Sequence, residues 1–235
     1  MALTPRFVRG GLVVHWLEGA LLFEREGEAM LVDVPAGVVP LLRDRSALGR
    51  IQTVLLTSGR TRAVEGLVPL LCALEPWRAR KAPLTLRTFL GEERGPTLTA
   101  AWSRAWPDRY PLLQDGLLPG AEDQVGAFTL RTVPQRHGEP HWREDRVVPA
   151  AGVAVRVATP EATVAWVPGA APSPAVRRAC RGADLAVIEV GVEPWPRAEE
   201  PWRLSLAQAL EAGAEAGEVW LVGDDGRFGL GGEEQ

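Results

Sequence analysis

The segment SGRTRA, residues 58–63, carries side chains that could bind an anion. It follows the apolar run of residues 54–57, which is typical of a buried strand. It precedes leucines at helical spacing in residues 67–74, so the segment is expected to form a strand-to-helix turn. Arg60 and Arg62 stay protonated in proteins and bind carboxylate or phosphate with paired donors, but they have no lone pair for a metal. The turn therefore favours an anion over a metal ion.

Two other functions are possible for this turn and the histidines later in the sequence: a serine nucleophile and a metal site. Ser58 could act as a nucleophile with His137 as its base and Asp224 or Asp225 orienting the imidazole, although TSGRT lacks the G-x-S-x-G pattern. His137 and His141, with Asp224, could instead hold a metal ion. The intervening Gly138 and Pro140 indicate a surface loop for HGEPH rather than a helix that would place both histidines on one face.

Composition excludes several classes of function. The chain has 235 residues, 46% of them hydrophobic, and a net charge of −4. This charge does not attract DNA or an anionic membrane. No stretch is long and apolar enough to span a bilayer, and the start lacks a signal-peptide layout, so a cytoplasmic protein is expected. Cys72 and Cys180 are expected to be buried thiols. Asparagine is absent and Lys81 is the only lysine, which is consistent with a thermophile and equally with a GC-rich genome.

The elements that must position these residues form an α/β chain with many short strands. Alternating or apolar runs in the first third predict a meander, and later strands alternate with helices over residues 97–106, 173–182 and 204–217. Ser173 is the expected N-cap of the second of these helices. This pattern predicts two β-layers faced by helices in a single domain over residues 1–235, with a flexible acidic and Gly-rich tail at 226–235.

The order of motifs resembles the metallo-β-lactamase superfamily, nearest to its RNase Z-like and phosphodiesterase-like branches. MLVDVPAG is similar to the family's LLIDxG and places Asp33 at its acid. LLTSGRTRAVEGL keeps the frame of LTHxHxDHxxGL, and ADLAVIE is similar to ADLLIHE. The resemblance implies a four-layer αββα sandwich of two mixed β-sheets flanked by helices. It also places Trp195 and Trp202 in a loop where relatives carry substrate-binding insertions, so these side chains serve either packing or a partner surface.

The resemblance also locates the family's metal ligands, which this chain lacks. The matching positions read Ser58, Arg60, Arg62, Ala63, Gly169, Arg203 and Asp224, and His137 alone is retained. Family enzymes use divalent metals for hydrolysis. Because most of the ligands are missing here, the protein is expected to be metal-free, to have no cofactor and to be non-catalytic.

The family fold would bring together Arg60, Arg62, Arg136, His137 and Arg203, where they would bind a small anion or a phosphate-containing ligand. These arginines could equally pair with internal carboxylates: Asp33, Glu65, Asp184, Glu189, Asp224 or Asp225. A protein partner or a homodimer is a further expectation, whereas RNA binding is not expected. The alternative is a metal-dependent hydrolase or phosphodiesterase, RNase Z-like, acting on ester or phosphodiester bonds through a relocated or partial site at His137, His141 and Asp224.

Overall fold

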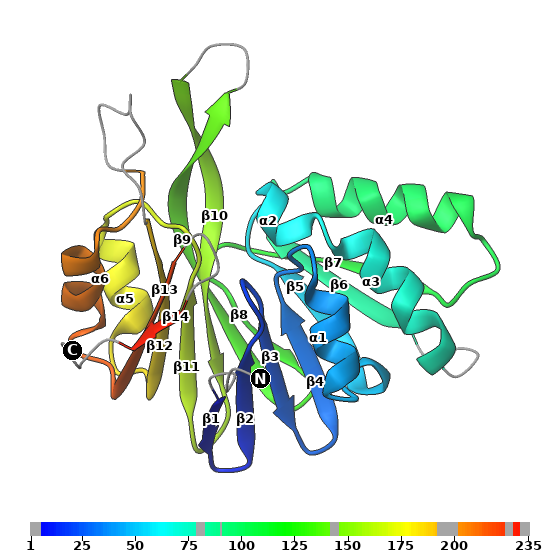
Figure 1. Cartoon of the computed structure of the whole chain (residues 1–235), viewed down its shortest axis with the longest axis horizontal. Coiled ribbons are helices and arrows are strands. Elements are labelled where there is room, and N and C mark those ends of the chain that lie inside the picture. Colours follow the sequence, from blue (N-terminus) through cyan, green and yellow to red (C-terminus); the bar gives the residue numbers. More distant parts are fainter. Residues whose placement is uncertain are drawn as a thin grey trace. The chain divides into compact units, whose positions relative to one another are not determined.

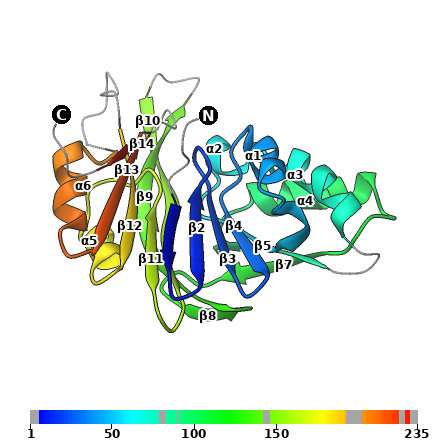
Figure 2. The same ribbon diagram turned by 60° about the horizontal axis from the view of Figure 1, so that its bottom comes forward.

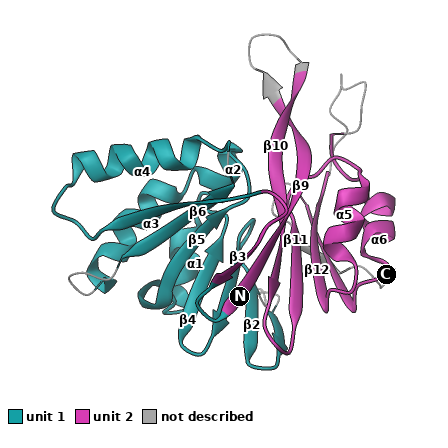
Figure 3. Ribbon diagram, turned by 180° about the vertical axis from the view of Figure 1, so that it is seen from behind, with its two compact units in different colours: residues 1–118, 125–127 teal, residues 119–124, 128–235 magenta. Residues whose placement is uncertain are grey.

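A computed structural model describes residues 6–78, 83–89, 91–141, 146–191, 202–223 and 228–230. The chain divides into two compact units, each built on one β-sheet (Figure 3). Unit 1 comprises Met1–Leu118 with Val125–Ala127, and unit 2 comprises Pro119–Gln124 with Phe128–Gln235.

Unit 1 contains a mixed sheet of seven described strands in sequence order (Figure 2). The first four form an antiparallel meander, and β4 to β7 run parallel. The strands are β1 (Arg6–Arg9), β2 (Leu12–Trp16), β3 (Leu21–Arg25), β4 (Glu28–Val32), β5 (Ile51–Leu56), β6 (Leu84–Phe89) and β7 (Leu112–Leu117). Parallel neighbours require crossover connections, and helices supply them here.

These crossovers contain the helices of unit 1, and α1, α3 and α4 lie on one face of the sheet (Figure 1). The helices are α1 (Val38–Asp44), α2 (Thr61–Val64), α3 (Leu67–Leu74) and α4 (Arg94–Ala105), with short 3-10 turns η1 (Leu48–Arg50) and η2 (Glu75–Trp77). Leucines at helical spacing in α3 pack against buried residues of β4 and β5 in one apolar core, which holds the β5–α2 turn at the end of the sheet.

Unit 2 contains a second mixed sheet, also of seven described strands, ordered β14-β13-β12-β11-β10-β9-β8. The strands are β8 (Glu122–Val125), β9 (Phe128–His141), β10 (Arg146–Ala158), β11 (Thr163–Val167), β12 (Leu185–Val190), β13 (Glu218–Gly223) and β14 (Phe228–Leu230). Helices α5 (Pro174–Cys180) and α6 (Leu206–Gly213) pack on one face of it around a core of alanine, valine and leucine (Figure 1). Two mixed sheets with helices confirm the α/β class expected from the sequence.

Three local expectations need correction. HGEPH is not a loop: it continues β9 and pairs with β10, with Gly138 opposite Pro149 and Pro140 opposite Val147. Proline is tolerated there because β8 has only four residues, so the far part of β9 is an edge in the described sheet. Ser173 precedes α5 as expected, but its side chain makes no capping hydrogen bond. Phe228–Leu230, inside the expected tail, pair with β13 as β14.

The two cysteines differ in environment, which corrects the expectation that both are buried. Cys72 is exposed, whereas Cys180 is buried in unit 2. Burial raises the pKa of the Cys180 thiol to about 12, so this thiol stays protonated and unreactive at neutral pH. No helix among the described residues has the length and apolarity needed to span a membrane.

Gly66 sets the approach of α3 to the loop after β4, and its replacement tests that packing. A Cβ at Gly66 would lie 2.3 Å from the Pro35 carbonyl oxygen, although its φ of −84° suits any residue. We expect Gly66→Ala to lower the free energy of unfolding by about 2 kcal/mol, since the clash involves rigid backbone. Urea denaturation measures this change.

Gly49→Ala is the matched control, because the nearest contact of its new methyl group is the Trp77 side chain at 3.4 Å. We expect it to leave stability nearly unchanged. Equal losses in the two variants would contradict the steric account of Gly66.

Candidate functional site

A buried carboxylate clamps the ends of β4 and β5 in unit 1. Asp33 follows β4 with a φ of 61° and is 2% exposed. Its Oδ1 accepts a hydrogen bond of 2.8 Å from the backbone N of Thr57, which follows β5, and the Thr57 hydroxyl lies 2.7 Å from Oδ2. Hydrogen bonds to an ionised carboxylate are stronger than neutral ones. The acid of the resembled motif therefore fixes where the β5–α2 turn begins.

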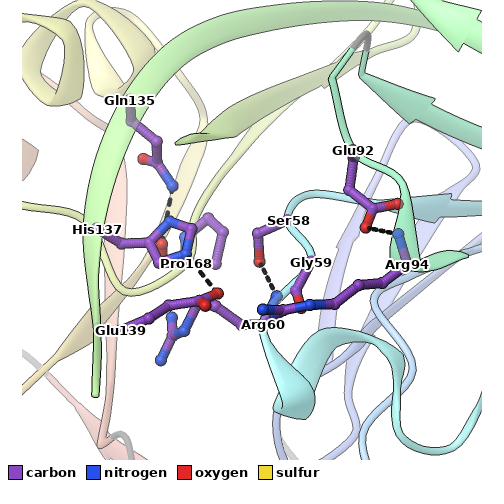
Figure 4. Close-up of polar contacts among 9 residues, drawn as sticks. All are labelled: Ser58, Gly59, Arg60, Glu92, Arg94, Gln135, His137, Glu139 and Pro168. Carbon is purple, nitrogen blue, oxygen red and sulfur yellow. Dashed lines mark hydrogen bonds and ion pairs between the residues drawn. The ribbon is translucent and has the colours of Figure 1, made fainter. Parts of the chain in front are cut away.

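The turn itself presents Ser58, Arg60 and Arg62 in different environments. Ser58 is 2% exposed, and its Oγ lies 3.4 Å from the backbone N of Arg60 as a hydrogen-bond acceptor (Figure 4). Arg60 immediately precedes α2 and is half-buried. Arg62 lies within α2, and its guanidinium packs over Gly19, where an added Cβ would lie 3.1 Å from Nε. The turn thus buries its hydroxyl and keeps its two cations partly accessible.

Arg94 is a third cation at this turn, and the sequence analysis missed it. Its Nη1 donates a hydrogen bond to the carbonyl oxygen of Gly59 (Figure 4). Glu92, 7% exposed, accepts hydrogen bonds from the backbone N of Arg94 at 2.7 Å and of Gly95 at 3.0 Å, and so holds the first turn of α4. The helix was expected to begin at Thr97, whereas it begins at Arg94. The acidic pair Glu92-Glu93 before the helix was the available signal.

His137 lies in β9 of unit 2, almost fully buried. It is 1% exposed, and its Nε2 lies 3.4 Å from Oε1 of Glu139 (Figure 4). Two residues earlier, Nε2 of Gln135 donates a 2.8 Å hydrogen bond to the carbonyl oxygen of Pro168. The backbone N of Ala171 donates to the Arg136 carbonyl oxygen at 2.8 Å. These bonds attach β9 to the loop after β11, which contains Gly169 of the resembled metal motif.

The remaining candidates of unit 2 lie in different parts of the unit. Arg203 is half-buried and packs on Gly191, where an added Cβ would lie 3.1 Å from Cβ of Arg203. Arg136 is exposed. His141 is the last residue of β9. Asp224 and Asp225 lie outside the described residues.

The expected arginine cluster and the Ser58–His137 pair draw on both units, and they stay predictions. Arg60 and Arg62, with Ser58, belong to unit 1, whereas Arg136, His137 and Arg203 belong to unit 2. Three carboxylates proposed as ion-pair partners accept hydrogen bonds from backbone amides: Asp33 from Thr57, Glu65 from Ala36, and Asp184 from Thr163.

The side chains at the resembled ligand positions do not fit a divalent metal. A stable zinc site needs at least three protein ligands, and a guanidinium has no lone pair to donate. Within the described parts of the chain, no group of three or more His, Cys, Asp or Glu side chains is arranged to hold a metal ion. Only Ser58, a buried hydroxyl, offers oxygen at the unit 1 turn among the motif positions 58, 60, 62 and 63.

Solved structures identify the fold. The metallo-β-lactamase fold protein YhfI from Bacillus subtilis aligns with a TM-score of 0.67 at 16% identity, over 86% of this chain and 76% of its own. Human tRNase Z, short form, gives 0.66 at 18% identity, over 86% and 84%. A diphosphatase from the PhnP family gives 0.64 at 14% identity, over 89% and 75%. The fold is that of the metallo-β-lactamases, as the sequence motifs predicted.

Sequence comparison adds nothing beyond the fold. No protein-family model matches the chain, and a search of curated proteins finds no match either.

The Asp33–Thr57 clamp can be tested by removing its acceptors. Asp33→Ala leaves the buried Thr57 amide without its acceptor and puts alanine at a positive φ, so we expect a loss of about 3 kcal/mol in the free energy of unfolding. Asp33→Asn keeps one acceptor oxygen and tolerates the backbone conformation, so its loss should be smaller. Chemical denaturation followed by circular dichroism measures both.

Asp44→Ala, at the exposed end of α1, removes the same charge as a control. The clamp would be refuted by an Asp33→Ala variant no less stable than Asp44→Ala.

Proposed function

We propose that this metallo-β-lactamase-fold protein binds a small anion at the β5–α2 turn of unit 1 and has lost the metal centre of the enzymes that share its fold. One observation carries the proposal: Arg60, Arg62 and Arg94 meet at one turn, where Arg94 reaches the Gly59 carbonyl oxygen from α4. By the motif resemblance, Arg60 and Arg62 stand at metal-ligand positions. Permanent positive charges stand where electron-pair donors are needed. Such charges repel a divalent cation and attract an oxyanion.

Two buried carboxylates adjoin the turn, and both already accept backbone hydrogen bonds. One is Asp33, and the other is Glu92, whose Oε1 would lie 2.8 Å from a Cβ at Gly59. Its oxygens accept hydrogen bonds from the first turn of α4. A guanidinium carries five N–H donors, so one arginine can contact several acceptors at once. Arg60 and Arg62 are both half-buried.

A phosphate-bearing anion is the proposed ligand. Planar guanidinium groups bind phosphate oxygens in pairs. A tRNase and a diphosphatase share the fold, and from their names we extend to this chain only the ligand chemistry, a phosphate group. Hydrolysis is not part of the proposal, because Ser58 is buried and already accepts a hydrogen bond from the Arg60 backbone.

Anion binding can be measured as a thermal shift. At saturating inorganic phosphate, about 100 times its Kd, we expect Tm to rise by about 5 °C, since the ligand binds only the folded state. Arg60→Gln and Arg94→Gln should each reduce the shift by more than half. Arg104→Gln removes a charge from the last turn of α4, about 15 Å along the helix, and should keep the full shift. No shift, or the same shift in all variants, would defeat the proposal.

The metal content of the protein tests the second half of the proposal. We expect less than about 0.1 equivalent of zinc, manganese or iron by elemental analysis after purification without chelator, because three protein ligands are needed for stable binding. More than about half an equivalent would overturn the loss of the metal centre and favour the hydrolase that uses His137, His141 and Asp224. Phosphodiesterase turnover that disappears on removal of the metal would establish that alternative.

A further inference from the structure

Unit 2 contains a cavity of about 530 Å³ between the middle of β9, the loop of residues 171–173 and helix α5. Its volume lies in the range of small-ligand sites. The polar lining residues are Gln135, Arg136, Ser173 and Arg178, and the rest of the wall is largely proline, alanine and the Trp202 side chain. His137, Gly169 and Arg203 do not line it, whereas Arg136, a member of the arginine cluster expected from the sequence, does.

Two arginines give the cavity a positive charge. Arg136 from β9 and Arg178 from α5 are both exposed, and neither forms an ion pair with a carboxylate in the described part of the chain. Their neighbours on the helix side differ: Arg177 pairs with Glu211, and Arg181 pairs with Glu215 at 3.0 Å. Arg136 and Arg178, which line the cavity, therefore have no carboxylate partner among the described residues, unlike Arg177 and Arg181. Two such positive charges beside one cavity favour an oxyanion as ligand.

Two buried polar atoms of the same wall lack hydrogen-bond partners among the described residues. Gln135 is 6% exposed; its Nε2 donates to the Pro168 carbonyl oxygen at 2.8 Å, which assigns the amide orientation and leaves Oε1 without a donor. The Ser173 Oγ is the second atom, since it makes no capping bond to α5. Native proteins rarely leave such atoms unsatisfied. A ligand with O–H or N–H groups would supply the missing donor to Gln135.

Trp202 completes the wall because Gly138 gives it room. A Cβ at Gly138 would lie 2.6 Å from Cβ of Trp202 and 2.4 Å from Cγ1 of Val147. The indole can therefore lie directly on β9, beside the cavity. It offers a flat apolar surface to the carbon skeleton of a ligand.

We propose that this cavity binds a small organic oxyanion, a phosphate ester or a carboxylate, that also carries hydroxyl groups. Arg136 and Arg178 hold the anionic group, Gln135 and Ser173 contact the hydroxyls, and Trp202 covers the carbon skeleton. The site is independent of the proposed anion site in unit 1, and it lies wholly within unit 2.

Calorimetric titration with glycerol 3-phosphate and with citrate tests the site and distinguishes phosphate from carboxylate. The titrations use the full-length Arg60→Gln protein, in which binding at the unit 1 turn is weakened. We expect saturable binding of at least one of the two ligands and none of glycerol. Arg178→Gln should weaken binding at least tenfold, because it removes a charge-assisted hydrogen bond. Arg177→Gln, the adjacent residue paired with Glu211, should leave the affinity unchanged.

The hydroxyl contacts are tested with Ser173→Ala, a change small enough to preserve folding. It should weaken glycerol 3-phosphate and leave ethyl phosphate, which lacks the two hydroxyls, unaffected. The proposal is overturned if neither oxyanion binds at about 10 mM, a concentration far above the Kd range of specific sites. It is also overturned if Arg177→Gln and Arg178→Gln weaken binding equally, or if Ser173→Ala weakens the binding of both phosphates alike. If the wild-type protein binds phosphate and the Arg60→Gln protein binds none, the unit 1 site is supported and the unit 2 site is refuted.

Discussion

The Asp33–Thr57 contact is the interaction on which the unit 1 site depends. It joins the ends of two parallel strands through a buried carboxylate, and everything from Ser58 to α2 is positioned from that point. Neighbouring backbone bonds continue the same connection, from Val34 N to the Ala63 carbonyl oxygen and from Gly66 N to the Val34 carbonyl oxygen. Among the residues that match the resembled metal motif, only Ala63 takes part in these bonds, and it does so through its backbone. The scaffold of the turn can therefore persist while the side chains that it presents change.

This separation allows the side chains of the β5–α2 turn to vary without loss of the fold. Arg60 and Arg62 project from a turn whose shape is set by Asp33, Thr57 and the glycines around it. Arg94 is added from α4 through the Gly59 carbonyl oxygen, and Glu92 anchors that helix start. The turn thus combines three arginines with two buried carboxylates, Asp33 and Glu92, that accept hydrogen bonds from backbone amides.

Much of the fold follows from the sequence, because strand alternation and leucine spacing are local signals. The meander of β2–β4 and the crossover from β5 to α3 were predicted from such patterns. The errors arose where long-range pairing outweighed local propensity. Gly138 and Pro140 read as loop residues, yet pairing with β10 over thirteen positions keeps them in a strand. Arg94 escaped notice because its role depends on a contact 35 residues away. The cavity beside α5 combines side chains from three separate segments, and no sequence pattern links them.

Gly138 has a consequence for how this chain can diverge. Its missing side chain makes room for an indole 64 positions later, so the two sites cannot change independently. A methyl group at position 138 would meet Cγ1 of Val147 at 2.4 Å and Cβ of Trp202 at 2.6 Å, so among orthologues it should appear only together with changes at both position 147 and position 202. Position 138 would then covary with the positions that its missing side chain leaves room for.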